Sequence, residues 1–188
     1  MKNTSGFTLI ELLIVIGVLG ILAAGLMAAV APFEQLKKAR DANNRNAVIE
    51  LHNAFTRYYA THGGLPWDDT AAATYGTGAC AVALFGGSRV GSSVQLSNAG
   101  MQDCILALEG DGELKAGFVN AVGTAQADKL YINSENTTSV MVCFPPEGKG
   151  LWKDTSTKYD STAQDQSAGT CGPQKPATPD NTCFFCAK

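Results

Sequence analysis

The chain has 188 residues, with 14 Lys and Arg against 17 Asp and Glu, and its formal net charge is −3. From Thr61 onward there are eight basic and thirteen acidic residues, an acidic balance that argues against direct binding of nucleic acid. Between Glu34 and Ala60 there are five basic and three acidic residues, a collar suited to lipid headgroups or acidic neighbours.

The first predicted element is an apolar helix over residues 7–31, interrupted by a single carboxylate, Glu11. A helix of these 25 residues reaches about 37 Å, enough to cross a hydrocarbon core of about 30 Å. An acid at membrane depth costs roughly 3 kcal/mol, and Glu11 is therefore expected to have a partner or a task.

Two general interpretations of this stretch leave something unexplained. A removable secretory signal would end at the small residues Ala29–Ala31, but Pro32 would directly follow the cut and the apolar run exceeds the usual length of about 7–15 residues. A plain single-span anchor accounts for the length of the stretch but not for Glu11.

A third interpretation comes from the stretch GFTLIELLIVIGVLGILAA, which closely resembles the N-terminus of type IV pilins and of the pseudopilins of type II secretion. The resemblance implies a leader peptide at residues 1–6, cleavage after Gly6 by a prepilin peptidase, and N-methylation of the new first residue, Phe7. Glu11 falls at the fifth position of the cut chain, where the family has its glutamate.

The resemblance implies a structural subunit rather than an enzyme: a precursor in the cytoplasmic (inner) membrane with its N-terminus inside, later part of an extracellular or periplasmic filament. Its partners would be copies of itself, other pilin subunits, the prepilin peptidase, the inner-membrane assembly platform and, before assembly, membrane lipid. The Lys/Arg rule predicts the opposite orientation, because Lys37, Lys38 and Arg40 outnumber the basic groups of the leader. The cysteines favour the orientation that the resemblance implies.

A physical role for Glu11 follows from cleavage, which exposes a cationic amine on Phe7. In a bundle of staggered helices, Glu11 of one subunit would meet the amine of its neighbour. The attraction is about 1 kcal/mol in water and several-fold larger in a low-dielectric bundle, where it offsets the desolvation of both charges. Glu11 is therefore predicted to be an assembly residue.

The helix is predicted to continue to about His62, with a kink at Pro32 that opens the backbone near Ala28. Its apolar face carries residues at three- and four-residue steps, namely Val48, Leu51, Phe55 and Tyr58. Ion pairs are expected on the opposite side, among Lys37, Asp41 and Arg45. The predicted organisation is a leader at 1–6, a transmembrane and assembly half-helix at 7–31, a head-packing half-helix at 32–62, and a globular head with a polar C-terminal tail at 63–188.

The head is predicted to be α+β and pilin-like, with a long N-terminal helix packed against a small antiparallel sheet. Residues 67–93 are expected to be mostly loop, followed by a helix capped by Ser97 and a second helix over residues 113–122. Alternation of apolar residues over 129–133 and 138–144 predicts an antiparallel hairpin, and a third strand is expected around Leu151 and Trp152. Residues 153–182 are polar and would be mobile unless tied down.

Six cysteines, all in the polar part, indicate an oxidising compartment and up to three disulfides, with buried free thiols as the alternative. They are Cys80, Cys104, Cys143, Cys171, Cys183 and Cys186. The favoured pairing joins Cys80 to Cys104 and divides Cys143 and Cys171 between Cys183 and Cys186. Family pilins often close a C-terminal loop in this way.

Other candidate chemistry is weaker. Cys183 and Cys186 form a C-x-x-C spacing, but redox use expects a following helix and zinc expects a second such pair. Calcium is an alternative at Glu109, Asp111 and Glu113, which do not match the twelve-residue calcium loop. Asp154, Asp160 and Asp165 are too sparse to be assigned as the calcium-holding Asp-rich loop that secretion pseudopilins have near the C-terminus. No metal site, cofactor or catalytic constellation is assigned, and His52 and His62 have no nucleophile nearby in the sequence.

The sequence therefore predicts a pilus subunit, with a type II secretion pseudopilin as the alternative. The absence of an Asp-rich calcium loop favours the pilus. Two interpretations of a different class are a membrane-anchored thiol oxidoreductase and a secreted binding domain released by signal peptidase.

Overall fold

A computed structural model describes residues 6–30, 32–86, 89, 91–172, 175 and 182–188. These residues form two compact units, one ending at Leu36 and the other beginning at Lys37. Residues 1–5 of the predicted leader and Ala31 lie outside the described residues. The predicted α+β class, with a long apolar N-terminal helix, an antiparallel sheet and disulfides in the C-terminal region, is confirmed.

The predicted N-terminal helix is assigned as two helices, α1 (Leu9–Val30) and α2 (Pro32–His62). The backbone is helical at Ala28, and the described part of the chain resumes as helix at Pro32. Because Ala31 lies outside the described residues, the kink expected at Pro32 stays a prediction.

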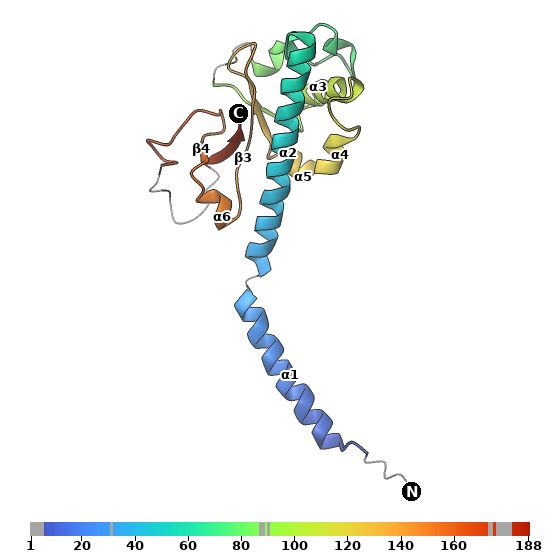
Figure 1. The fold of residues 1–188 in the computed structure, drawn as a ribbon, viewed down its shortest axis with the longest axis vertical. Coiled ribbons are helices and arrows are strands. Elements are labelled where there is room, and N and C mark those ends of the chain that lie inside the picture. The colour runs from blue at the N-terminus through green and yellow to red at the C-terminus, as the bar shows by residue number, and fades with distance from the viewer. Residues whose placement is uncertain (1–5, 31, 87–88, 90, 173–174, 176–181) are drawn as a thin grey trace. The chain divides into compact units, whose positions relative to one another are not determined.

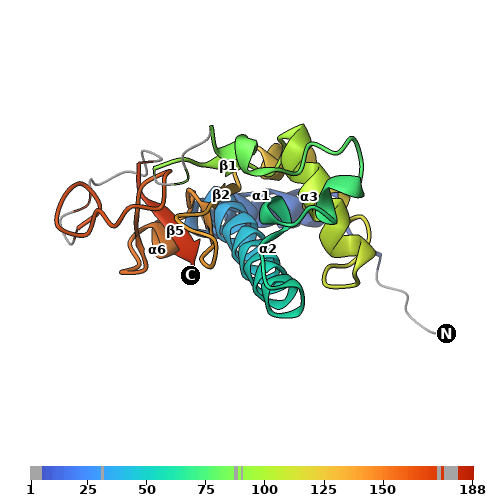
Figure 2. The ribbon, with the colours of Figure 1, turned by 90° about the horizontal axis from the view of Figure 1, so that it is seen from above.

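Five short antiparallel strands form one sheet in the order β1-β2-β3-β5-β4 (Figures 1 and 2). The predicted hairpin is confirmed in β2 and β3, where Ile132 lies opposite Val142. The other three strands were not predicted, because β1 and β4 have only two and three residues and β5 lies within a cysteine-rich tail. The strands are β1 (Val94–Gln95), β2 (Tyr131–Asn133), β3 (Met141–Phe144), β4 (Thr157–Tyr159) and β5 (Phe184–Ala187).

Short helices occupy the connections. The 3-10 turns η1 (Pro66–Asp68), η2 (Ala72–Thr74) and η3 (Val82–Phe85) lie in the predicted loop, and α3 (Ala99–Gly110), α4 (Phe118–Val122), α5 (Thr124–Ala127) and α6 (Lys149–Trp152) follow. In Figure 1, α3, α4 and α5 lie on one side of α2, whereas α6 and β4 lie on the other; Figure 2 likewise shows α3 on one side and α6 and β5 on the other.

Three details of these connections differ from the sequence prediction. The cap of α3 is Asn98 rather than Ser97, since the Asn98 side chain accepts the N–H groups of Gly100 and Met101. The helix predicted over residues 113–122 is reduced to α4, because Gly117 before it takes a left-handed conformation. The strand expected at Trp152 is wrong: this residue ends α6, its ring buried.

The core of the second unit is built on one face of α2, as predicted. Val48, Leu51 and Phe55 are fully buried and Tyr58 is 1 % exposed. The sheet is covered on both faces, because the residues of β3 that alternate with Val142 and Phe144 are buried too. The smaller cluster on that second face contains Met141, Cys143, Ala163, Phe184 and Cys186. The tail after residue 153 thus supplies part of the core.

Candidate functional site

The side chains of α1 lie uncovered within the described structure. Leu9–Met27 has a mean hydropathy of 2.7 with none of its residues buried, and it is long and apolar enough to cross a membrane. Leu9 is 86 % exposed and Ile21 76 %. An apolar surface of this size needs lipid or other protein to cover it.

Glu11 is tied to the start of α1 by a reciprocal pair of hydrogen bonds with Thr8. The Glu11 carboxylate accepts the Thr8 backbone N–H at 3.0 Å and its hydroxyl at 2.8 Å, while the Thr8 hydroxyl oxygen accepts the Glu11 N–H at 3.3 Å. This is a capping box, which satisfies two N–H groups that a helix start otherwise leaves unpaired. Glu11 thus has a partner within its own chain. The sequence analysis did not identify Thr8 as a site residue, although the T-x-x-E spacing of Thr8 and Glu11 is the sequence pattern of a capping box.

Gly6 and Phe7, the residues of the predicted cleavage site, precede this capping box and are both exposed, Phe7 at 80 %. Successive α-carbons are about 3.8 Å apart, and an amine created on Phe7 would thus lie one residue from the amide that Glu11 already accepts. The carboxylate is therefore positioned at the end of the helix where a new terminal charge would appear.

The six cysteines form three disulfides in the second unit. Cys80 is joined to Cys104, Cys143 to Cys186, and Cys171 to Cys183, so the two cysteines of the C-x-x-C spacing bond different partners. Both are buried, Cys183 at 1 % exposure and Cys186 at 8 %. A thiol oxidoreductase requires an exposed dithiol, and this arrangement does not provide one.

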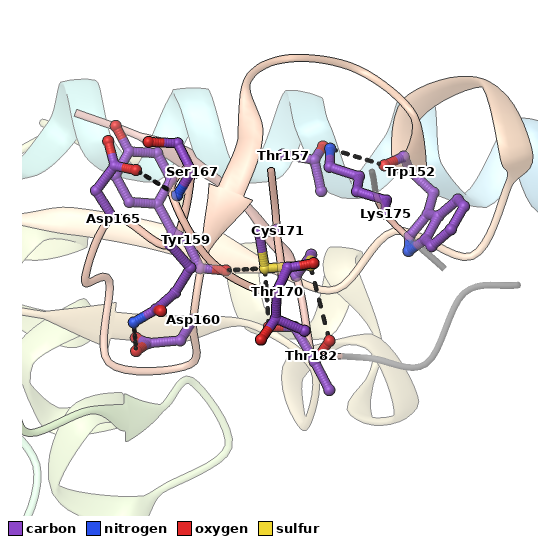
Figure 3. The surroundings of a disulfide bond; sticks show 12 residues. Trp152, Thr157, Tyr159, Asp160, Asp165, Ser167, Thr170, Cys171, Lys175 and Thr182 are labelled. Atoms are coloured by element: carbon purple, nitrogen blue, oxygen red, sulfur yellow. Dashed lines mark hydrogen bonds between the residues drawn. A yellow bond between two sulfur atoms is a disulfide. The ribbon is translucent and has the colours of Figure 1, made fainter. Parts of the chain in front are cut away.

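Polar residues around Cys171 hold the polar tail in place (Figure 3). The Lys175 ammonium donates to the backbone carbonyls of Trp152 at 3.1 Å and Asp154 at 2.6 Å, and burial lowers the pKa of this lysine. Lys158 donates to Asp165 at 2.6 Å, and this bond holds the pKa of the Asp165 carboxyl well below its usual range. Within the described part of the tail, disulfide and hydrogen bonds thus supplement the few apolar residues that are buried there.

The acidic residues considered for calcium have partners in the protein. The Asp160 carboxylate accepts the N–H groups of Thr162 and Gln164 and closes its own loop. Across the head, Glu109 accepts the Phe118 N–H and Glu113 pairs with Arg57 at 2.8 Å. Among the residues with described positions, no three His, Cys, Asp or Glu side chains gather where they could hold a metal ion.

The two histidines lie on α2, and the Nδ1 of His62 is 2.9 Å from the hydroxyl of Thr61. His62 stacks on the ring of Tyr58, with centroids 4.0 Å apart, and its Nε2 lies 3.4 Å from Asp111. His52 lines a shallow hollow beside the β2–β3 loop. Both histidines are thus ordinary residues on the surface of a helix.

Asp41 does not form the ion pair expected with Lys37 or Arg45. Its carboxylate is 3 % exposed and accepts the backbone N–H groups of Glu147 at 2.8 Å and Gly148 at 2.7 Å. Burial raises the pKa of Asp41 against the effect of these two bonds. A β-carbon at Gly148 would lie 2.9 Å from the Asp41 carboxylate, and this position therefore requires a glycine. Instead of the ion pair predicted from sequence spacing, Asp41 forms hydrogen bonds that connect α2 to the segment just before α6.

Residues 1–27 match the family model of the prokaryotic N-terminal methylation motif. No curated protein and no solved structure matches the chain. The match covers the predicted cleavage site, Glu11 and most of α1, and it confirms the resemblance for this segment. Over residues 1–27 the chain therefore carries the N-terminal methylation signal shared by type IV pilins and pseudopilins.

Proposed function

We propose that the chain is the precursor of a structural subunit of a type IV pilus-like filament, not an enzyme. The observation that carries the proposal is the methylation motif on a helix whose described apolar stretch, Leu9–Met27, has no buried residue. Lipid would cover this helix in the precursor, and the same helix of neighbouring subunits would cover it in the filament. The head, with its sheet and three disulfides, would face outward.

Processing would supply the counter-charge for Glu11. Cleavage after Gly6 by a prepilin peptidase, followed by methylation of Phe7, leaves a cationic amine at the end of α1. Within one subunit this amine lies near Glu11, which is already held by Thr8 at 2.8 Å. In a staggered bundle the amine of a neighbouring subunit would pair with Glu11. Because two separated charges in an apolar bundle are strongly penalised, the pairing favours one register of assembly.

The three disulfides of the head support an orientation for this proposal. Because disulfides form in oxidising compartments, the head would lie in the periplasm or outside the cell. The N-terminus would then face the cytoplasm, against the Lys/Arg rule. An inner-membrane assembly platform would extract the subunit into an extracellular or periplasmic filament.

Mass spectrometry of the native protein tests the processing step. The expected mature chain begins with N-methylated Phe7. A chain that retains Met1 would contradict cleavage, and a chain that begins at Pro32 would show release by signal peptidase.

Electron microscopy of material sheared from intact cells separates a pilus from a secretion pseudopilus. Long surface fibres that react with antibody against the head are expected for a pilus. Protein confined to the periplasm, together with loss of protein secretion when the gene is deleted, would instead identify a pseudopilin.

A further inference from the structure

The loop between β2 and β3 carries a sequence motif that the proposed function does not use. Asn136, Thr137 and Thr138 form N-T-T, an instance of the N-x-[S/T] pattern in which the asparagine accepts a sugar. The same pattern occurs at residues 3–5, within the predicted leader that cleavage after Gly6 would remove. Asn136 is therefore the one asparagine of the sequence after Gly6 that has a serine or threonine two positions further on.

The motif lies at the surface, where a modifying enzyme can reach it. Residues 135–138 are all exposed, whereas β3, which follows them, is buried throughout. The backbone carbonyl of Asn136 accepts hydrogen bonds from Arg89 at 3.1 Å and from the Ser134 hydroxyl at 2.8 Å. These two bonds hold the backbone of the loop, and the side chain of Asn136 lies on its exposed side.

The side chain of Asn136 is oriented by its own motif. Its Oδ1 accepts hydrogen bonds from the Thr138 N–H at 2.9 Å, the Thr138 hydroxyl at 2.9 Å and the Ser139 N–H at 2.8 Å. Two of these donors are backbone N–H groups, and they fix which atom of the carboxamide is the oxygen. Within the part of the chain that the structure describes, no hydrogen bond engages the Asn136 Nδ2. The nitrogen that would carry a sugar is thus available.

The three hydrogen bonds also bear on the reactivity of this amide. A carboxamide nitrogen is a weak nucleophile because its lone pair is delocalised into the carbonyl group. Loss of a proton from Nδ2 makes it nucleophilic, and donors placed on Oδ1 stabilise the negative charge that then develops there. Thr138, the residue that the motif requires, supplies two of the three donors.

We propose that Asn136 is an N-glycosylation site, which accepts a sugar from a donor activated as a phosphate or diphosphate ester. In the transfer, Nδ2 forms a bond to C1 of the sugar and gives up one proton to a base of the transferring enzyme. The bond between C1 and the donor's phosphate oxygen breaks, and the phosphate or diphosphate leaves with the electron pair. In one respect the inference rests on the proposed function, whose orientation would put Asn136 outside the cytoplasm, and the transferring enzyme would act there.

Mass spectrometry of the protein purified from its own cells tests the modification. Trypsin cuts after Lys129 and Lys149 and releases residues 130–149, the tryptic peptide that contains Asn136. After reduction and alkylation of Cys143, this peptide is expected to carry the additional mass of one or more sugar residues. Fragmentation that preserves side-chain modifications should place this mass on Asn136. A peptide found only at its unmodified mass would overturn the inference and leave the motif as an ordinary turn.

Paired substitutions show whether the motif directs the modification. Asn136→Gln keeps a carboxamide and Thr138→Val keeps the shape of the threonine without its hydroxyl, and both variants should lose the modified form. Thr137→Val is the matched control, because Thr137 is exposed in the same loop and occupies the variable position of the motif. This variant and Thr138→Ser should retain the modified form. A sugar that persists in Asn136→Gln would lie on another side chain, and one that persists in Thr138→Val would not depend on the motif; either result contradicts the inference.

The same spectra separate a failure of this inference from a failure of the proposed function. A chain that begins with N-methylated Phe7 and carries an unmodified Asn136 overturns glycosylation alone. A chain that retains Met1 contradicts the proposed function, whether or not Asn136 carries a sugar.

Discussion

The carboxylate of Asp41 accepts the backbone N–H of Gly148 at 2.7 Å, across 107 residues of sequence. This bond and its companion from Glu147 attach the first half of α2 to the segment between β3 and α6. Both amide groups need an acceptor because the contact excludes water.

Replacing Asp41 should therefore destabilise the head. Asp41→Ala leaves buried N–H groups without an acceptor, at an expected loss of roughly 1–3 kcal/mol in the free energy of unfolding. Asp41→Asn retains one carbonyl oxygen and should lose less. Glu50→Ala is the control, since this acid is exposed on the same helix. Denaturant unfolding of the full chain in detergent measures all three, and equal stability of Asp41→Ala and the control would contradict the role of this contact.

The buried carboxylate of Asp103 predicts a dependence of stability on pH. Burial acts to raise its pKa, but hydrogen bonds from the Thr77 hydroxyl at 2.6 Å and from the Thr77 and Ala79 amides outweigh burial and lower it. The folded pKa thus lies below the unfolded value of about 3.9. The stabilisation is therefore present above about pH 4 and is lost as the pH falls through the folded pKa. Between pH 7 and pH 2, the melting temperature should fall more steeply for the native chain than for Asp103→Asn. Parallel plots of melting temperature against pH for the two proteins would contradict this role of Asp103.

The three disulfides should differ in their contribution to stability. Cys143–Cys186 spans 43 residues and Cys171–Cys183 spans 12, which in the chain-entropy model correspond to about 4 and about 3 kcal/mol. Replacing both cysteines of a pair by serine should therefore lower the melting temperature more for the longer span. The Cys80–Cys104 pair, spanning 24 residues, should fall between them. The reverse order would indicate that the native environment of each pair outweighs loop closure.

Glu11→Ala should separate processing from assembly. The peptidase site before it is intact, and a processed chain that begins at Phe7 is expected in the membrane. Without the carboxylate, the amine of a neighbour finds no counter-charge, and sheared filaments should be rare. A normal filament yield from this variant would contradict an assembly role for Glu11.

Thr8 offers a finer test of how Glu11 is held. Thr8→Ser preserves the hydroxyl that exchanges hydrogen bonds with Glu11, whereas Thr8→Ala removes it. Loss of a cap costs about 1 kcal/mol of helix stability. The alanine variant should therefore show faster amide hydrogen exchange at the start of α1 in detergent micelles. Equal exchange in the two variants would mean that the hydroxyl contributes nothing there.

The N-terminal signal and the hairpin were predictable because each depends on residues close together in sequence. Ile132 and Val142 alternate within one short region, and the apolar segment around Glu11 needs no tertiary context. Asp41 was misjudged for the opposite reason: its four-residue spacing from Lys37 and Arg45 is local, but its hydrogen-bond partners lie more than a hundred residues away. Trp152 likewise ends α6 and is buried, where the local sequence had suggested a strand.

The position of β5 within the sheet has a consequence for biogenesis. This strand follows the others in sequence but lies between β3 and β4, and among the described strands β4 pairs only with it. The centre of the sheet can therefore close only after Phe184–Ala187 has been made and is free to pair. A chain that stops a few residues short of that strand would leave β3 and β4 without their shared partner and the two thiols of Cys143 and Cys171 without theirs, and it would be open to proteolysis.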